Sequence, residues 1–278
     1  MFKSFKIANY TEKEYSEDSY FVSENYIIVI DGASSLIRYE NSNFLTNKFV
    51  NGIRDNLAVL LSDSSINIQE ALKKSLNNLL KKDKQKLFTK HDISATISIF
   101  RIVGEYLEIY YLGDSPIIIK TSSDIQEYVA KDISKLDSSV LKKMKEISLN
   151  KKTNVLESKN SKLIKDMLIK NRGLKNTKDG YWILDTTGKG IENGNYFRVT
   201  LKEIENIIVC SDGFSQIYDT FKIYNKLEDL FKDLENNSME NIVEKLVKEQ
   251  NKDKDLNNYP RFTKTDDITA VYVGEIKC

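Results

Sequence analysis

The sequence predicts an α+β fold in which antiparallel strands and helices occupy separate runs of the chain. Three apolar segments, Ser94 to Val103, Tyr106 to Leu112 and Ile117 to Thr121, are separated only by short turns, so three neighbouring antiparallel strands are expected. Helical spacing occurs elsewhere, in pairs of amphipathic segments. Because these strands follow one another without intervening helices, a meander is favoured over a parallel sheet built from βαβ units.

The chain is organised around the segment from Tyr26 to Ser34. Its five consecutive apolar residues before Asp31 predict a strand that is buried on both faces, and the run stops at Asp31-Gly32. Asp-Gly is also the commonest hairpin turn signal. The same design recurs, however, at Ser211-Asp212-Gly213 and, as a variant, at Gly113-Asp114-Ser115. Several strands that are far apart in the sequence therefore end in an aspartate.

Helices are expected on either side of these strands. Asn67 and Glu70 form a plausible N-terminal capping pair for the second helix. A further strand is expected at Tyr181 to Leu184, and a last one follows Asp266-Asp267. Apolar residues at three- and four-residue spacing mark the helices at 44–61, 68–80, 226–234 and 239–250.

The middle of the chain, about residues 124–180, is lysine-rich and mostly helical in pattern. It lies between two strand-rich halves, so we expect an insertion or flap that covers one edge of a site. The lysines themselves are typical of a solvated face. No linker rich in proline or serine interrupts the sequence, which favours a single domain over residues 1–278.

Composition narrows the function. Of the 278 residues 40% are apolar and 30% are charged, and no apolar run is long enough to span a membrane, as is typical of a soluble globular protein. A net charge of +1 gives no field that favours nucleic acid or an anionic membrane. The N-terminus lacks the features of a signal peptide, so a cytoplasmic location is expected. With only 2 cysteines and 1 histidine, neither a disulfide framework nor a multi-histidine metal site is expected.

The acidic residues at strand ends indicate metal chemistry. Like charges that converge on one site need cations to compensate them, and oxygen ligands without histidine or cysteine favour Mg²⁺ or Mn²⁺. Two such ions activate a water and neutralise a phosphoryl group, so hydrolysis of a phosphate ester needs no side-chain nucleophile. A P-loop is excluded because Ile183 and Gly190 occupy two of its defining positions. The residues are Glu17, Asp18, Asp31, Asp114, Asp212, Asp266 and Asp267.

The order of these acidic motifs along the chain resembles that of the metal-dependent serine/threonine phosphatases of type 2C. That family has a Glu-Asp pair, an Asp-Gly turn, a Gly-Asp-Ser turn, a Ser-Asp-Gly turn and an acidic pair before the last strand. The matching motifs here run nearly from end to end of the chain, and Ser94-Ala95-Thr96 stands where the family has a strand of small residues. They are Glu17-Asp18, Asp31-Gly32, Gly113-Asp114-Ser115, Ser211-Asp212-Gly213 and Asp266-Asp267.

The resemblance implies a role for each residue. Asp31 would bridge two metals, one of them also bound by the Gly32 carbonyl, and Asp212 and Asp266 would complete the first metal site. Asp114 would help to hold a third, weaker ion. Glu17 and Asp18 would hold metal-bound waters, with Asp267 next to them. The implied fold is a four-layer α/β/β/α sandwich of two packed antiparallel sheets with helices outside both.

The sequence departs from the family on the substrate side. Lys13 stands where many members have an arginine that grips the substrate phosphate, and a lysine lacks the bidentate fork of arginine. Arg38 and Arg172 are therefore candidates for an additional cation. The segment from Leu136 to Gly180 also lacks the usual family sequence, so it does not identify the substrate.

The function expected from these residues is hydrolysis of phosphoserine and phosphothreonine in proteins, with two or three Mg²⁺ or Mn²⁺ ions as cofactors. Two alternatives remain on the same scaffold: a phosphatase of a small phosphorylated metabolite, and a non-catalytic regulator that binds a partner protein. The expected partner is a phosphorylated protein, with neither nucleic acid nor membrane. The oligomeric state does not follow from the sequence.

Overall fold

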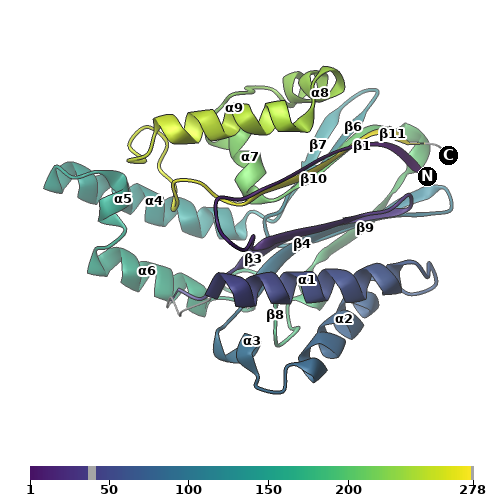
Figure 1. Ribbon diagram of the computed structural model, residues 1–278, viewed down its shortest axis with the longest axis horizontal. Helices are drawn as coiled ribbons and strands as arrows, with labels where there is room; N and C mark the ends of the chain where they lie inside the picture. The colour runs from purple at the N-terminus through teal and green to yellow at the C-terminus, as the bar shows by residue number, and fades with distance from the viewer. Residues whose placement is uncertain (37–41, 277–278) are drawn as a thin grey trace.

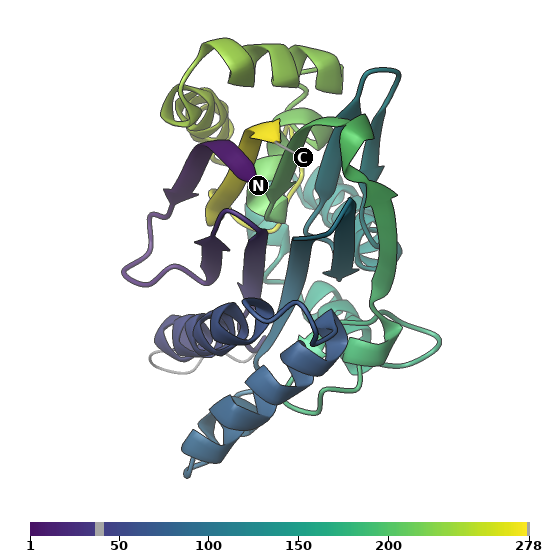
Figure 2. The same ribbon diagram turned by 90° about the vertical axis from the view of Figure 1, so that its right-hand side faces the viewer.

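The structure, a computed structural model, describes residues 1–36 and 42–276. Two antiparallel sheets pack face to face, and helices cover the outer face of each sheet (Figure 1). The view in Figure 2, turned by 90°, shows the two sheets between their helical layers. The expected four-layer α/β/β/α sandwich is therefore confirmed.

The first sheet joins the two ends of the described chain. Its N-terminal strand β1 pairs with the C-terminal strand β11, with Ala8 opposite Ala270. The N-terminal strand was not expected from the sequence. The strand order is β1 (Phe2–Tyr10), β11 (Ile268–Ile276), β10 (Ile204–Cys210), β6 (Ile117–Thr121) and β7 (Ile125–Tyr128).

The second sheet contains the segment on which the chain is organised. Its inner strand β3 lies between the edge strand β2 and the central strand β4, and carries Asp31 and Gly32 near its end. A short strand, β8 (Leu184–Asp185), also pairs with the first residues of β4. The order is β2 (Asp18–Val22), β3 (Tyr26–Ala33), β4 (Ser94–Val103), β5 (Tyr106–Leu112) and β9 (Asn195–Thr200).

The expected helices form, and each group covers one sheet. The Asn67 side chain caps the second helix by accepting a hydrogen bond of 2.7 Å from the Glu70 amide, as the sequence predicted. Helices α1 (Ser42–Leu61), α2 (Ile68–Lys82) and α3 (Leu87–Lys90) lie on the side of the second sheet, and α7 (Asp212–Asp219), α8 (Leu227–Asn236) and α9 (Met239–Lys252) on the side of the first. Two short 3₁₀ turns, at Ile191–Asn193 and Leu201–Glu203, flank β9.

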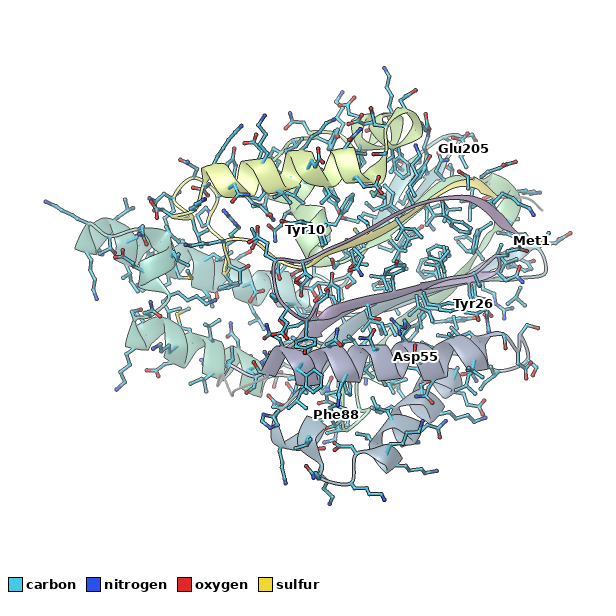
Figure 3. The ribbon with its side chains drawn as sticks, viewed as in Figure 1. Met1, Tyr10, Tyr26, Asp55, Phe88 and Glu205 are labelled. Carbon is cyan, nitrogen blue, oxygen red and sulfur yellow. The ribbon has the colours of Figure 1, made fainter. Side chains whose placement is uncertain are left out.

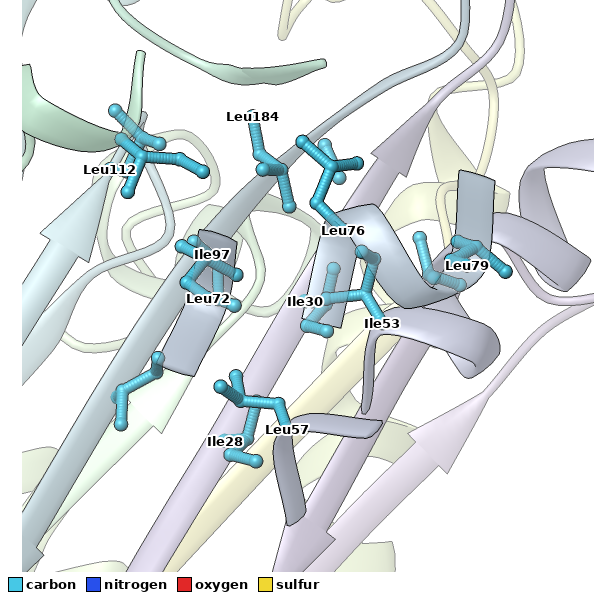
Figure 4. Packing of buried hydrophobic residues seen from close by; sticks show 14 of the residues in the cluster. Ile28, Ile30, Ile53, Leu57, Leu72, Leu76, Leu79, Ile97, Leu112 and Leu184 are labelled. Carbon is cyan, nitrogen blue, oxygen red and sulfur yellow. The ribbon is translucent and has the colours of Figure 1, made fainter. Parts of the chain in front are cut away.

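Strand β3 is buried on both faces, as its continuous apolar sequence predicted. Ile28 and Ile30 pack toward Ile53 and Leu57 of α1, whereas the alternate residues face the other sheet (Figure 4). Side chains fill the space between the sheets, and the Tyr26 hydroxyl reaches across to α1, where it donates to the Ala58 carbonyl at 2.6 Å (Figure 3). This packing holds the end of β3, and therefore Asp31, in a fixed position.

The expected three-stranded meander is wrong at its second turn. Strands β4 and β5 pair, but β6 belongs to the other sheet, where it pairs with β10 and β7. The chain crosses between sheets at Gly113, whose φ of +92° suits glycine, and a Cβ there would lie 2.6 Å from the Thr96 side chain. The expected strand at Tyr181 to Leu184 is also shorter, because only its last residue enters β8.

The helical insertion begins later than expected. Ile125–Tyr128 is strand β7 of the first sheet, so the helical part of the segment 124–180 starts at Asp132. Helices α4 (Asp132–Lys151), α5 (Val155–Ser158) and α6 (Lys162–Gly173) lie together at one end of the sandwich (Figure 1). They enclose a small apolar cluster of their own: Val140, Met144, Val155 and Ile164, joined by Leu256 from the loop before β11. No helix among the described residues is long and apolar enough to cross a membrane.

Candidate metal centre

Strand pairing brings the first acidic residues together. Asp18, the first residue of β2, is directly opposite Asp31 of β3 in the sheet register. The next residue, Gly32, donates its amide hydrogen to the Glu17 carbonyl at 3.0 Å. The turn that carries Glu17, before β2, and the Asp31-Gly32 motif near the end of β3 are therefore joined at one end of the second sheet.

Asp212 comes to the same place from the first sheet. It is the first residue of α7, directly after β10, and the Ser211 amide before it donates to the Thr269 carbonyl at 2.9 Å. A Cβ on Gly213 would lie only 2.0 Å from the backbone oxygen of Asp267, so only glycine allows this approach. Close contact of α7 with the start of β11 therefore places Asp212 beside the pair at 266–267.

Two cavities open onto these carboxylates. One has a volume of about 270 Å³ and is lined by Asp31, Asp114 and Asp212. The other, of about 610 Å³, is lined by Asp114, Asp212 and Asp266. The fold therefore brings together four aspartates that the sequence placed at separate strand ends.

Burial and mutual repulsion act on these carboxylates. Burial raises the pKa of Asp31 well above its usual range, and the charges of Asp18 and Asp212 raise it further. Burial and the nearby Asp212 raise the pKa of Asp266 to about 7. Burial also raises the pKa of Asp212, although the neighbouring Asp31 side chain opposes the rise. The site therefore favours positive charge, as a proton or as a cation.

Asp18 is a further buried carboxylate in a setting that favours a cation. Its side chain is buried, and its Oδ2 atom has no hydrogen-bond partner among the described residues. Burial raises the pKa of Asp18 well above its usual range, although hydrogen bonds from Ser211 and Thr269 oppose the rise. An unpartnered carboxylate oxygen of this kind has a free position for a cation or a cation-bound water.

Glu17 and Asp267 are instead held by protein donors. The Lys13 ammonium lies 2.7 Å from Glu17 Oε2 and 3.0 Å from Asp267 Oδ2. Asp267 also accepts from the Thr11 hydroxyl at 2.5 Å and from the Glu17 amide at 2.7 Å, and the Ser34 hydroxyl donates to Glu17. This network ties the turn before β2 to the start of β11.

Lys13 is charged in this setting. Burial lowers the pKa of its ammonium, but the attraction of Glu17, Asp267 and Asp266 outweighs burial and raises the pKa above its usual value. Its role as a phosphate ligand stays a prediction, because the contacts that Lys13 makes are with carboxylates.

The donor set fits hard divalent ions. All of the converging side chains offer carboxylate oxygens, which Mg²⁺ and Mn²⁺ prefer, and neither cysteine nor histidine is among them. Within residues 1–36 and 42–276, no three acidic, histidine or cysteine side chains are gathered closely enough to hold a metal ion as they stand. Binding would therefore require the carboxylates to turn inward, which two open cavities leave room for.

Two further residues reach the site from the insertion. Asp137 of α4 lines both cavities, and burial together with Asp212 raises its pKa to about 7. The sequence contained a signal for it, since Asp137 falls on the apolar stripe of α4, between Ile133 and Val140. Arg172 of α6 lines the smaller cavity, which agrees with its choice as a candidate cation. Arg38, the other candidate, lies outside the described residues.

A family model for protein phosphatase 2C matches residues 8–250. The chain belongs to the protein phosphatase 2C family. Proteins of this family are serine/threonine phosphatases and in general depend on metal ions, so the enzyme class and the resemblance read from the five motifs are confirmed. The match ends before Asp266, and that part of the site is therefore known here from the geometry alone.

Solved structures of bacterial phosphatases resemble this phosphatase over its whole length. The serine/threonine phosphatase PstP/Ppp of Mycobacterium tuberculosis is 12% identical, with a TM-score of 0.56 over 98% of this chain and 99% of that one. Stp1 of Staphylococcus aureus is 13% identical, with a TM-score of 0.55 over 100% of this chain and 96% of that one. At such identities the likeness supports the fold. No curated protein sequence matches the phosphatase significantly.

Proposed function

We propose that this phosphatase removes phosphate from phosphoserine and phosphothreonine in proteins, with Mg²⁺ or Mn²⁺ ions held by the converging aspartates. The observation that carries the proposal is the meeting of Asp31, Asp114, Asp212 and Asp266 at two cavities, next to the unpartnered carboxylate oxygen of Asp18. The family membership supports the reaction, and a protein phosphatase implies phosphoprotein substrates.

Each residue of the cluster would have its own role. Asp31, the Gly32 carbonyl, Asp212 and Asp266 would hold two ions, and Asp114 would contribute to a third. When bound, such ions supply an activated water and neutralise the charge of the phosphoryl group. The buried strand β3 keeps the Asp31 carboxylate at the end of the sheet, where the cavity opens.

The remaining acidic residues and Lys13 orient this centre. Asp18 presents its free oxygen toward the same end of the sheet. Lys13 keeps Glu17 and Asp267 in place through its two short ion pairs. Because Asp267 directly follows Asp266, this anchoring also limits where the Asp266 carboxylate can go.

Metal removal tests the proposal. Purified protein with Mn²⁺ should release phosphate from p-nitrophenyl phosphate and from a phosphothreonine peptide, and EDTA should abolish both activities until Mn²⁺ is restored. Asp212→Asn should lower kcat by about 100-fold or more, because it removes a carboxylate from the centre of the site. Asp166→Asn, on the exposed face of α6, is the matched control and should keep full activity.

Three results would contradict the proposal. Turnover that persists in EDTA would exclude a metal-activated water. Turnover of small phosphate esters without any release from phosphopeptides would favour a metabolite as the substrate. Absence of both turnover and Mn²⁺ binding in a calorimetric titration would favour the non-catalytic regulator.

A further inference from the structure

A phosphate dianion that enters a cluster of carboxylates needs a cation whose charge is not already neutralised. Lys13, the residue predicted for this task, has its ammonium 2.7 Å from Glu17, 3.0 Å from Asp267 and 3.9 Å from Asp266. A phosphate group could reach this ammonium only in competition with three carboxylates that belong to the same network. Lys13 is therefore poorly suited to grip the substrate.

Arg172 is a cation that reaches the site without such carboxylate partners among the described residues. It lies in the last turn of α6 and lines the smaller cavity together with Asp31 and Asp212. Its Nη1 atom donates to the Ser94 hydroxyl at 3.0 Å, and its Nη2 atom donates to the Ser34 carbonyl at 2.8 Å.

These two hydrogen bonds fix the guanidinium beside the metal centre. Ser94 is the first residue of β4 and is paired with Ala33 of β3, and Ser34 follows β3 directly. One anchor therefore begins β4, and the other directly follows β3, the neighbouring strand that carries Asp31. The position of Arg172 relative to Asp31 is set by the sheet, although Arg172 itself comes from the insertion.

The charge of Arg172 is not cancelled by its anchors. A hydroxyl and a backbone carbonyl are neutral acceptors, and within residues 1–36 and 42–276 Arg172 forms no ion pair. Asp137, which lines the same cavity, attracts it only from beyond ion-pair distance. A guanidinium has five N–H donors, of which these contacts use two. The others can form the bidentate pair that arginine makes with phosphate.

We propose that Arg172 binds the phosphoryl group of the substrate, which is the role that the family resemblance predicted for Lys13. The insertion then supplies part of the phosphate-binding site. The inference rests on the proposed function, since it concerns the same site and substrate class. It gives the insertion a chemical role besides covering the cavity. The second part of that role is steric, because apolar side chains of the insertion line the cavity next to Arg172: Ile133, Leu136 and Leu168.

Phosphate binding can be measured apart from turnover. Inorganic phosphate would be titrated calorimetrically into the Mg²⁺-loaded wild-type protein and into Arg172→Ala, Arg172→Lys and the control Lys170→Ala. Lys170 has the same charge and lies on the exposed side of the same helix. Arg172→Ala should weaken phosphate binding about tenfold or more, as expected for loss of a charge-assisted hydrogen-bonded pair. Arg172→Lys should recover only part of it, because a point charge lacks the fork.

Kinetics of the same variants separate binding from support of the fold. KM for p-nitrophenyl phosphate and for a phosphothreonine peptide should both rise about tenfold in Arg172→Ala, with a smaller change in kcat. Unchanged phosphate affinity and KM in this variant would overturn the inference, and so would a loss of kcat or of thermal stability alone. Phosphate binding that depends on Arg172 in a protein without turnover would support the inference while contradicting the proposed function.

Discussion

The surroundings of the Asp18 side chain indicate that the site favours a cation. Its backbone is fixed opposite Asp31, its side chain is buried, and one carboxylate oxygen has no partner among the described residues. Burial opposes ionisation, and the charges of Asp267 and Asp266 add to that opposition. A buried carboxylate without a cation destabilises the fold, so we expect a positively charged ligand to bind beside Asp18.

Asp18→Asn should stabilise the protein when no cation is bound. An amide keeps the hydrogen-bonding shape without the charge, so the variant should be more stable than the wild type in EDTA, by about 1–3 kcal/mol. Its midpoint of thermal unfolding should rise by a few degrees. The stabilisation that Mn²⁺ gives to the wild type should be smaller in the variant. Thermal unfolding with EDTA and with Mn²⁺ measures both effects.

The control for this prediction is Asp166→Asn, which removes an exposed carboxylate that lines neither cavity. It should leave both unfolding midpoints unchanged. If Asp18→Asn responded to Mn²⁺ as strongly as the wild type, Asp18 would have no part in cation binding.

At the scale of elements, the join between α7 and β11 builds half of the centre. Ser211 precedes the helix, and its hydroxyl accepts a hydrogen bond of 3.0 Å from the Thr269 amide on β11. Asp212 begins the helix, and Gly213 lies against the Asp267 backbone. The Ser-Asp-Gly motif therefore has a structural reason at each position: the serine joins helix and strand, the aspartate enters the cavity, and the glycine permits the contact.

Gly213→Ala tests this join. The added Cβ would lie 2.0 Å from a backbone oxygen, so α7 and β11 must separate, at a cost of about 1–3 kcal/mol. Because Asp212 and Asp266 stand on either side of the contact, kcat should fall by about tenfold or more. Steady-state kinetics with Mn²⁺ and a urea unfolding curve would measure the two effects.

Gly173→Ala is the matched control, since a Cβ at that position, at the end of α6, meets no atom within 4 Å. It should be neutral or stabilising by about 0.5–1 kcal/mol. Full activity and unchanged stability in Gly213→Ala would show that the helix and strand can separate without moving the carboxylates.

At the scale of the whole molecule, the insertion has a small apolar core of its own. Leu256, from the loop before β11, is completely buried in it at 0% exposure and has a φ of +59°, which is unfavourable for leucine. Burial of the side chain compensates this backbone strain. Leu256 therefore links the insertion to the segment that leads to Asp266 and Asp267.

Leu256→Ala should loosen the insertion while leaving the sandwich intact. Loss of the buried side chain costs about 2–5 kcal/mol, and the apolar clusters on and between the two sheets contain no residue of α4, α5 or α6. Amide hydrogen exchange should accelerate in α4 and α6 and stay unchanged in β3, β4 and β10. KM should rise as well, because α6 carries Arg172.

Lys254→Ala, an exposed residue of the same loop, is the control and should change neither exchange nor KM. Equal acceleration of exchange in both sheets would show that the insertion and the sandwich unfold together, contrary to the prediction.

Much of the fold could be predicted because its signals are local. The continuous apolar run before Asp31 identified a strand buried on both faces, and three- and four-residue spacing identified α1, α2, α8 and α9 in the outer layers, but neither α3 nor α7. The order of the acidic motifs identified the family. The sheet to which β6 belongs could not be predicted. A turn at Gly113 has the same sequence pattern whether the next strand pairs with β5 or enters the other sheet.

The sequence by itself predicted which residues carry the chemistry: Asp31, Asp114, Asp212 and Asp266 each stand at or near the end of a strand, where a charge does not interrupt the apolar core. Only the tertiary structure decided what surrounds them. Pairing of Lys13 with carboxylates and the approach of Arg172 depend on contacts between segments far apart in the chain. Such contacts follow from how the layers pack, which no local pattern of residues records.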